Sequence, residues 1–152
     1  MWISKDSQCP NNKPVTSSIF IQYVYVHFLY LFLGGYALYH SADIPQTKTI
    51  AKTVLKTPYF NITLFEVCLK FSYHMYGSNV KRLIIYVERT TAHLDYIWHS
   101  SYQQSDRWYD TQVTVRNFSG RLHFEATYGF GSLGDIALDN IAIEHGDCVD
   151  NG

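Results

Sequence analysis

The chain has 152 residues and a formal net charge of −1, and 16% of its residues are aromatic. A chain of this length suits one domain with a buried core, and its near balance of acidic and basic side chains excludes the basic surface on which nucleic-acid binders depend. The aromatic content, and the abundance of Val, Ile, Thr and Tyr between Val67 and Ile143, indicate the pleated, half-buried surfaces of an all-β protein.

The first part of the chain differs from the rest. Residues 1–33 comprise a polar leader, which we expect to be unstructured over residues 1–18, and an apolar and aromatic run over residues 19–33. As a helix this run would be about 22 Å long, shorter than the hydrocarbon core of about 30 Å. A longer segment over residues 19–39 would permit membrane association, although it includes two glycines. There are three other interpretations of this run: a secretory signal peptide, sequence that is not natively coding, and a buried hydrophobic hairpin.

From Gly35 onward, apolar and polar side chains alternate with the period of two that is typical of β-strands. Between residues 68 and 76, for example, Leu69 and Phe71 fall on one face and Lys70 falls on the other. The same alternation predicts strands at residues 81–89, 95–101, 107–115, 121–129 and 135–144, with a break at 77–79, a polar loop at 101–106 and a turn at 117–120. No window carries the apolar stripe of a helix. Strands of this length between closely spaced turns suggest a β-sandwich or jelly roll.

Glycines punctuate the segment between the last two predicted strands. Gly129, Gly131 and Gly134 spell G-x-G-x-x-G, a pattern that elsewhere cradles a dinucleotide or covers ATP. The dinucleotide fingerprint needs a helix after its glycines, whereas the residues after Gly134 resemble a strand, and the kinase motifs H-R-D and D-F-G do not follow. We therefore predict that these glycines form a tight turn or bulge between strands, and that no nucleotide binds there.

Several motifs occur in the order and at the spacing of one family. They are C-L-K-F-S-Y-H-M-Y-G at 68–77, I-W at 97–98, the strand-opening Trp108, and G-S-L-G-D-I-A-L-D-N-I at 131–141. With the upstream segments G-Y-A-L-Y-H-S and T-P-Y-F, these motifs resemble the MAM domain, which is named for meprin, a neuropilin and a receptor-type tyrosine phosphatase. The resemblance covers residues 34–148 and leaves a short tail at residues 149–152.

The resemblance implies a jelly-roll β-sandwich of two antiparallel sheets in the extracellular part of a secreted or cell-surface protein. It implies a non-catalytic adhesion or recognition module whose partner is a protein, including the same module on another chain. It also implies a disulfide between Cys68 and Cys148, which stand where the family's third and fourth cysteines do. The family's first segment has no counterpart in residues 1–33, so Cys9 lacks an evident partner and the sandwich is expected to lack one or two strands and to expose sheet edges.

Other candidate sites are few. Sequons at Asn61 and Asn117 are predicted glycosylation sites, and they favour an extracellular location. Asp135 and Asp139 follow the glycine turn, where the resemblance implies a structural calcium ion that would need six or more oxygen ligands. Because the family's first strand is absent and Asn140 replaces its second Asp, we favour capping of the turn by the Asp side chains. We expect no other cofactor.

No set of residues indicates catalysis. The sequence has no H-E-x-x-H and no G-x-S-x-G motif, so we expect the histidines to be strand-surface residues and Trp98 and Trp108 to be core anchors. Two alternatives to protein recognition stay open. One is a carbohydrate-binding module, which an exposed platform from Tyr102, Trp108 or Tyr109 would favour. The other is an accessory domain fragment of a membrane-bound or secreted protease.

Overall fold

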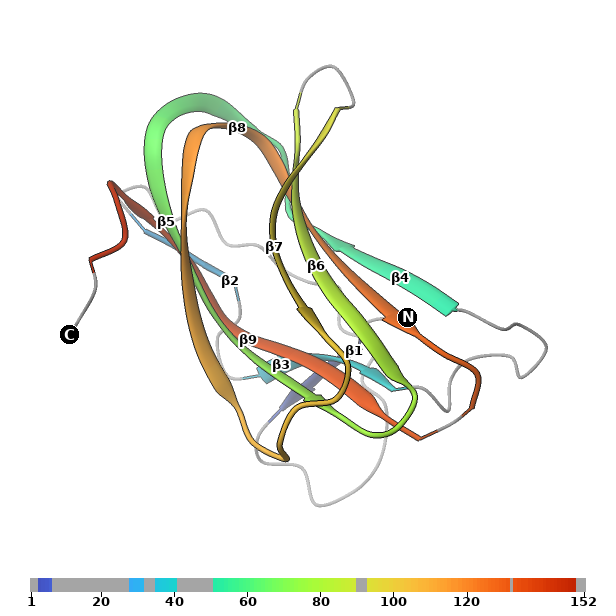
Figure 1. The fold of residues 1–152 in the computed structure, drawn as a ribbon. Helices are drawn as coiled ribbons and strands as arrows, with labels where there is room; N and C mark the ends of the chain where they lie inside the picture. Colours follow the sequence, from blue (N-terminus) through green and yellow to red (C-terminus); the bar gives the residue numbers. More distant parts are fainter. Residues whose placement is uncertain are drawn as a thin grey trace.

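The computed structural model (Figure 1) describes residues 3–6, 28–31, 35–40, 51–89, 93–131 and 133–149. Within these residues every assigned secondary-structure element is a β-strand. They are β1 (Ile3–Asp6), β2 (Phe28–Leu31), β3 (Gly35–His40), β4 (Ala51–Lys56), β5 (Phe60–Tyr76), β6 (Val80–Glu88), β7 (Leu94–Ser101), β8 (Tyr109–Tyr128) and β9 (Asp135–His145). The prediction of an all-β fold is confirmed.

The strands form two antiparallel sheets that share β8. In sheet A the order is β1-β3-β9-β5-β8, and β2 pairs with β9 beyond the end of β3. In sheet B the order is β4-β8-β6-β7. This arrangement is the jelly-roll β-sandwich of two antiparallel sheets that the family resemblance implies.

β8 passes from one sheet to the other without a break. Its residues 109–120 pair with β5, and its residues 121–128 pair with β4 and β6, so the strand arches over one end of the sandwich (Figure 1). Gly120 lies at this bend with φ 110°, and a Cβ on it would be 2.0 Å from the carbonyl oxygen of Glu88. Only glycine combines this φ with such a close approach. The predicted turn at 117–120 is therefore a bend within one strand, because the ladder continues on both sides of it.

The core lies between the two sheets. Side chains with almost no exposure include Leu69 and Met75 of β5, Leu83 and Ile85 of β6, Phe118, Leu122 and Phe124 of β8, and Ile136 and Leu138 of β9. Trp98 of β7 packs against this core, with its ring 5.0 Å from that of Phe71 and 5.1 Å from that of Tyr73. The prediction that Trp98 is a core anchor is confirmed. Trp108 is not a core anchor, because it lies ahead of β8 with 43% of its surface exposed.

A β-bulge interrupts β9. The core-facing residues are Ile136 and Leu138 before the bulge, and Ile141 and Ile143 after it. The register against β5 shifts between Lys70 and Ser72, and Asn140 has φ 50° at the bulge. Because a bulge inserts one extra residue, it re-aims the side chains around it. Here the bulge turns Asn140 toward the outer face of sheet A, where its amide reaches Ser72.

Short strands from the N-terminal part join sheet A. Residues 3–6, which we expected to be unstructured, form hydrogen bonds to β3 as β1. Residues 28–31 form β2 and residues 35–40 form β3, and both strands pair with β9, β3 through residues 37–40. The helix considered for residues 19–39 is therefore wrong at the described positions of this segment. None of the described residues belongs to a helix that is long and apolar enough to span a bilayer. Cys9 and residues 19–27 lie outside the described residues.

Candidate functional site

The loop that connects β8 to β9 carries the three glycines of the G-x-G-x-x-G pattern. Asn79, in the β5–β6 turn, holds this loop. Its carbonyl accepts from the Gly129 N–H at 2.8 Å, and its own N–H donates to the Leu133 carbonyl at 2.8 Å. The Asn79 side-chain oxygen also accepts from the Leu133 N–H at 2.8 Å. Gly131 and Gly134 have positive φ angles of 124° and 151°, so two of the three glycines occupy backbone conformations that other residues rarely adopt.

This loop and the β7–β8 loop present exposed hydrophobic side chains at one end of the sandwich. Tyr102, Phe130 and Leu133 are 67%, 64% and 66% exposed. Lys81 links the two loops, because its carbonyl accepts from the Tyr102 N–H at 2.7 Å, its ammonium lies 5.9 Å from the Tyr102 ring, and its side chain lies against Gly129. We call Tyr102, Phe130 and Leu133 the loop-end patch.

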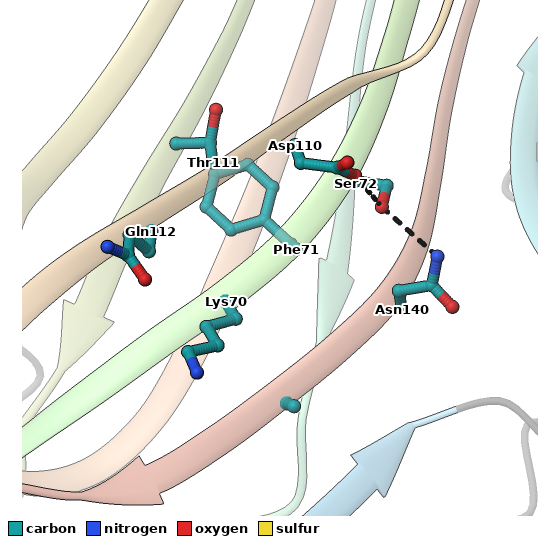
Figure 2. A pocket seen from close by; sticks show the side chains of 8 residues that line it. Lys70, Phe71, Ser72, Asp110, Thr111, Gln112 and Asn140 are labelled. Atoms are coloured by element: carbon teal, nitrogen blue, oxygen red, sulfur yellow. Dashed lines mark hydrogen bonds between the residues drawn. The ribbon is translucent and has the colours of Figure 1, made fainter. Parts of the chain in front are cut away.

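A groove of about 540 Å³ lies on the outer face of sheet A (Figure 2). Three adjacent strands line it, with Lys70, Phe71 and Ser72 from β5, Asp110, Thr111 and Gln112 from β8, and Asn140 and Ala142 from β9. Ser72 Oγ donates to Asp110 Oδ1 at 2.6 Å and accepts from Asn140 Nδ2 at 3.1 Å. One hydrogen-bonded row therefore crosses the groove, and because Ser72 is buried the row is a fixed floor.

Trp108 stands at one end of this face. It lies just ahead of β8, and its ring is 5.8 Å from the ring of His74, which shares the outer face of β5 with Ser72. The three aromatic residues considered as a platform are not brought together. Tyr102 belongs to the loop-end patch, and Tyr109 stacks on a core-facing tyrosine of β5 at 5.5 Å. Of the three, only Trp108 lies on the face that carries the groove, beside His74 and outside the lining residues.

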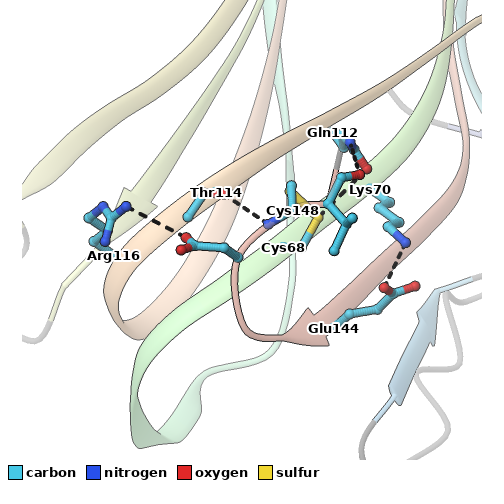
Figure 3. Close-up of a disulfide and its surroundings, with 9 residues drawn as sticks. Cys68, Lys70, Gln112, Thr114, Arg116, Glu144 and Cys148 are labelled. Atoms are coloured by element: carbon cyan, nitrogen blue, oxygen red, sulfur yellow. Dashed lines mark hydrogen bonds and ion pairs between the residues drawn. A yellow bond between two sulfur atoms is a disulfide. The ribbon is translucent and has the colours of Figure 1, made fainter. Parts of the chain in front are cut away.

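The predicted disulfide joins Cys68 and Cys148, whose Cα atoms are 4.7 Å apart (Figure 3). Cys68 lies on the outer face of β5, so the bond holds the segment after β9 against sheet A. Two hydrogen bonds fix the same segment to β8: the Cys148 N–H donates to Thr114 Oγ1 at 3.0 Å, and Gln112 Nε2 donates to the Val149 carbonyl at 2.9 Å. The pairing implied by the family's cysteine pattern is confirmed, and it lies beside the groove.

The family model described as MAM domain, meprin/A5/mu, matches residues 33–149. The chain belongs to the MAM domain family. As a MAM domain it is an extracellular module, which agrees with its disulfide.

Curated relatives of this MAM domain are longer proteins. The MAM domain-containing glycosylphosphatidylinositol anchor protein 1 of Gallus gallus is 32% identical over 118 residues, which cover 75% of this chain and 12% of the relative. The anchor protein 2 of Homo sapiens is 31% identical over 127 residues, which cover 76% of this chain and 13% of the relative. The chain thus spans about one eighth of the length of these relatives.

Two solved structures share the fold of this MAM domain. A cleaved adhesin domain of Lys-gingipain from Porphyromonas gingivalis superposes with a TM-score of 0.54 at 13% identity, covering 74% of this chain and 75% of the other. A carbohydrate-binding module of family 29 superposes with a TM-score of 0.52 at 16% identity, covering 99% of this chain and 94% of the other. At these identities the likeness concerns the jelly-roll fold alone.

The two predicted glycosylation sites of this MAM domain lie at the end opposite to the loop-end patch. Asn117 is exposed at the bend of β8, and its carbonyl accepts from Arg89 Nη1 at 2.5 Å. Asn61 lies in the first part of β5, which meets the same bend where Phe60 pairs with Gly120. β6 runs from one end of the sandwich to the other, and its 9 residues extend about 30 Å. Glycans at these positions would therefore leave the loop-end patch uncovered.

Asp135 and Asp139 do not fit one shared calcium site in this MAM domain. They stand four positions apart on β9, about 13 Å along an extended strand, whereas ligand oxygens lie only 2.3–2.6 Å from a calcium ion. Asp139 Oδ1 accepts instead from the Asn140 N–H at 2.7 Å, which is the kind of local contact that turn-capping side chains make. Within the part of the chain that the structure describes, no three or more His, Cys, Asp or Glu side chains form a group that could hold a metal.

A charged cluster on the outer face of sheet B was not predicted. Arg121 donates two hydrogen bonds to the Glu88 carboxylate, at 2.8 and 2.9 Å, and His123 Nε2 also contacts this carboxylate. The hydrogen bonds from Arg121 and His123 lower the pKa of Glu88 from 4.5 to about 2, while burial lowers the pKa of His123. These residues occupy alternate positions on β6 and β8. Only the pairing of the two strands brings them together, and no local sequence signal indicates that pairing.

Proposed function

We propose that this MAM domain is a non-catalytic recognition module that binds another protein at the cell surface through its loop-end patch. The observation that carries the proposal is the exposure of Tyr102, Phe130 and Leu133 on adjoining loops. Exposed apolar side chains gathered in one place are typical of protein interaction sites. Aromatic residues are also enriched at the centre of protein interfaces, where they contribute much of the binding energy.

The two loops that carry the loop-end patch are preorganised by hydrogen bonds. Asn79 accepts hydrogen bonds from the Gly129 and Leu133 amides and donates one to the Leu133 carbonyl, which fixes the two residues that flank the tip of the β8–β9 loop. The β7–β8 loop is fixed by the bond from Tyr102 to Lys81 and by a second bond from the Gln104 N–H to a β5 carbonyl at 2.7 Å. A preorganised surface loses less conformational entropy on binding, so more of its contact energy appears as affinity.

The location of the patch suits a protein exposed at the cell surface. Asn61 and Asn117 lie at the opposite end of the sandwich, so their glycans would not block a partner. The named relatives are glycosylphosphatidylinositol anchor proteins, and we propose by extension that the parent protein of this chain is attached to the cell surface. A second copy of the domain on a neighbouring cell is one partner of the required kind.

The surroundings of the histidines support a non-catalytic role. His74, His93 and His123 lie against carboxylates, and His99 lies against the Tyr96 hydroxyl. A general base must reach the proton of a nucleophile, and these four histidines contact acidic or phenolic oxygens instead of a Ser or Cys side chain.

The proposal is tested with fluorescently labelled domain on cultured cells. We expect saturable binding of the wild-type domain, and we expect this binding to disappear when the cells are pretreated with protease. The double variant Phe130→Ser, Leu133→Ser should not bind. The control is Phe65→Ser, which removes an aromatic side chain that is also highly exposed but lies toward the bend of β8. Binding that survives in the double variant, or that protease treatment leaves unchanged, would contradict the proposal.

A second measurement identifies whether the partner is the same domain. Sedimentation equilibrium of the purified domain reports self-association as a function of concentration. If the partner is a second copy, the wild-type protein and Phe65→Ser dimerise and the double variant stays monomeric. If all three stay monomeric while the cells are still bound, the partner is a different protein.

A further inference from the structure

We propose that this MAM domain also binds a neutral oligosaccharide, in the groove on the outer face of sheet A with Trp108 at its rim. This function is separate from protein recognition by the loop-end patch, because the groove lies on a sheet face and the patch lies on loops. The inference depends on three properties of the groove: its hydrogen-bonding groups, its exposed indole and its charge.

The floor of the groove presents fixed hydrogen-bonding groups of the kind that sugar hydroxyls need. Ser72 accepts one amide hydrogen of Asn140 and donates to one carboxylate oxygen of Asp110. The Asn140 amide oxygen and the second Asp110 oxygen remain as acceptors, and Figure 2 shows the Asn140 amide pointing its oxygen away from Ser72. Because the bulge in β9 and the buried Ser72 hold both side chains, these acceptors are positioned before a ligand arrives.

Trp108 supplies an apolar surface next to these acceptors. Trp108 is 43% exposed and lies just ahead of β8, two residues before Asp110. Its ring is 5.8 Å from the ring of His74, which lies two residues after Ser72 on the outer face of β5. Binding sites for small ligands combine aromatic surfaces with a few positioned polar groups. The C–H face of a sugar ring matches the indole, and its hydroxyls match Asp110 and Asn140. From Trp108 to Gln112 the face extends about 13 Å, which suits a short oligosaccharide rather than a single sugar.

The charge of the groove selects a neutral ligand. Lys70 is the one cation among the lining residues, and Glu144 engages its ammonium at 2.6 Å. Asp110 in the groove and Asp106, which lies 2.9 Å from His74 beside Trp108, add negative charge. A sulfated or otherwise polyanionic glycan would be repelled by these carboxylates. The surface therefore favours uncharged hexose or pentose units.

The experiment is a calorimetric titration of the purified domain with soluble oligosaccharides of mannose, glucose, galactose and xylose, and with a heparin oligosaccharide as the polyanion. We expect saturable binding to at least one neutral series and none to heparin. Trp108→Ala and Asn140→Ala should each weaken that binding about tenfold or more, the expected loss for one aromatic or hydrogen-bonded contact. Phe130→Ala, which removes an exposed ring from the loop-end patch, should bind like the wild type.

The outcomes separate this site from the protein-binding patch. Thermal unfolding of each variant verifies that the fold is retained, and Asp110→Asn provides a variant of unchanged shape that should also weaken binding. No binding to any neutral series at millimolar concentration, binding to heparin alone, or undiminished binding in Trp108→Ala would overturn the proposal. Loss of saccharide binding in Phe130→Ala would do the same, because it would place the ligand on the loops. Failure of the cell-binding experiment would leave these results unaffected.

Discussion

Gly77 and Gly134 pack backbone against backbone, so that a Cβ on Gly77 would lie 2.3 Å from the Gly134 Cα. The contact joins the β5–β6 turn to the β8–β9 loop at the end of the sandwich that carries the loop-end patch. It explains the last glycine of the G-x-G-x-x-G pattern. Gly134 has φ 151°, and a Cβ on it would meet a Val80 methyl at 2.9 Å.

We predict that Gly134→Val destabilises the domain by about 2–4 kcal/mol, because it adds backbone strain and a side chain with no space to occupy. The free energy of unfolding is measured by urea denaturation. Gly146→Ala is the control, since Gly146 also has a positive φ of 96° but a Cβ there meets nothing within 4 Å. Gly146→Ala should lose only about 1–2 kcal/mol of stability, because an alanine at this φ adds backbone strain without a steric clash. Equal losses in the two variants would show that crowding at Gly134 is unimportant.

ATP or NAD should leave the melting temperature of the domain unchanged. The amides of Gly129 and Leu133, which a phosphate-binding loop would aim at its ligand, already donate to Asn79. A ligand that binds only the folded state stabilises it by RT ln(1 + L/Kd), which increases with the ligand concentration L. A rise in melting temperature at millimolar nucleotide, measured by differential scanning calorimetry, would therefore contradict the structural role of the loop.

Local patterns account for most of the fold that the sequence predicts. Period-two alternation is a property of each strand by itself, so the strands predicted between residues 68 and 144 are found with their inward faces. β4 and the first half of β5 are not among the strands predicted from this alternation. The bend of β8 is missed because the sequence around Gly120 resembles an ordinary turn. Only the structure shows that a Cβ on Gly120 would lie 2.0 Å from the Glu88 carbonyl oxygen. The same holds for residues 3–6, which contain no alternation long enough to indicate that they add an edge strand to β3.

The candidate site is less predictable than the fold. The groove combines Ser72, Asp110 and Asn140 from three strands that are distant in sequence, and no local signal indicates that β5 lies between β8 and β9. Asn140 depends in addition on the bulge, which shifts the alternation of β9 by one position. Exposure of Trp108 is missed for a related reason, because a Trp that opens a strand resembles a core residue until the loop before it is placed.

Glycosylation is expected at Asn117. The residue is exposed and lies at a bend with φ 50°, so its side chain is accessible in the folded domain. We predict that the domain secreted from mammalian cells loses mass on treatment with an N-glycosidase, and that Asn117→Gln abolishes part or all of this change. Asn61→Gln is the companion variant for the second sequon. If N-glycosidase treatment leaves the mass of the secreted protein unchanged, and neither variant lacks any attached glycan mass relative to the wild type, glycosylation at both positions is excluded.

Reduction of the disulfide should destabilise the domain strongly. The Cys68–Cys148 bond closes a loop with a sequence separation of 80, for which the chain-entropy treatment gives about 4.5 kcal/mol, and observed losses are about 2–5 kcal/mol. We predict a loss in this range for the double variant Cys68→Ser, Cys148→Ser, measured by urea denaturation. Wild-type protein with added reductant should match the variant. A free thiol at Cys68 in the secreted protein, detected by mass spectrometry, would contradict the extracellular disulfide.

The last prediction concerns pH. The pKa of Glu88 is about 2 in the folded domain, chiefly because Arg121 donates to its carboxylate, and 4.5 is its ordinary value. Between these values the unfolded state binds more protons than the folded state, so stability rises with pH. The contribution of Glu88 is therefore fully present above about pH 4.5 and is lost as the pH falls toward 2. Burial also lowers the pKa of His123 below 6.5, which adds a loss of stability as the pH falls below that value.

We predict that the free energy of unfolding of the wild-type domain decreases as the pH is lowered from 7, and decreases further between pH 4.5 and 2. Glu88→Gln should be less stable than the wild type at pH 6, and its stability should depend less on pH between 4.5 and 2. Glu125→Gln is the control, because Glu125 lies on the same face of sheet B and pairs with Lys52 at 2.6 Å rather than with Arg121. The measurement is urea denaturation at a series of pH values. If Glu88→Gln keeps the acid dependence of the wild type, the Glu88–Arg121 pair does not cause it.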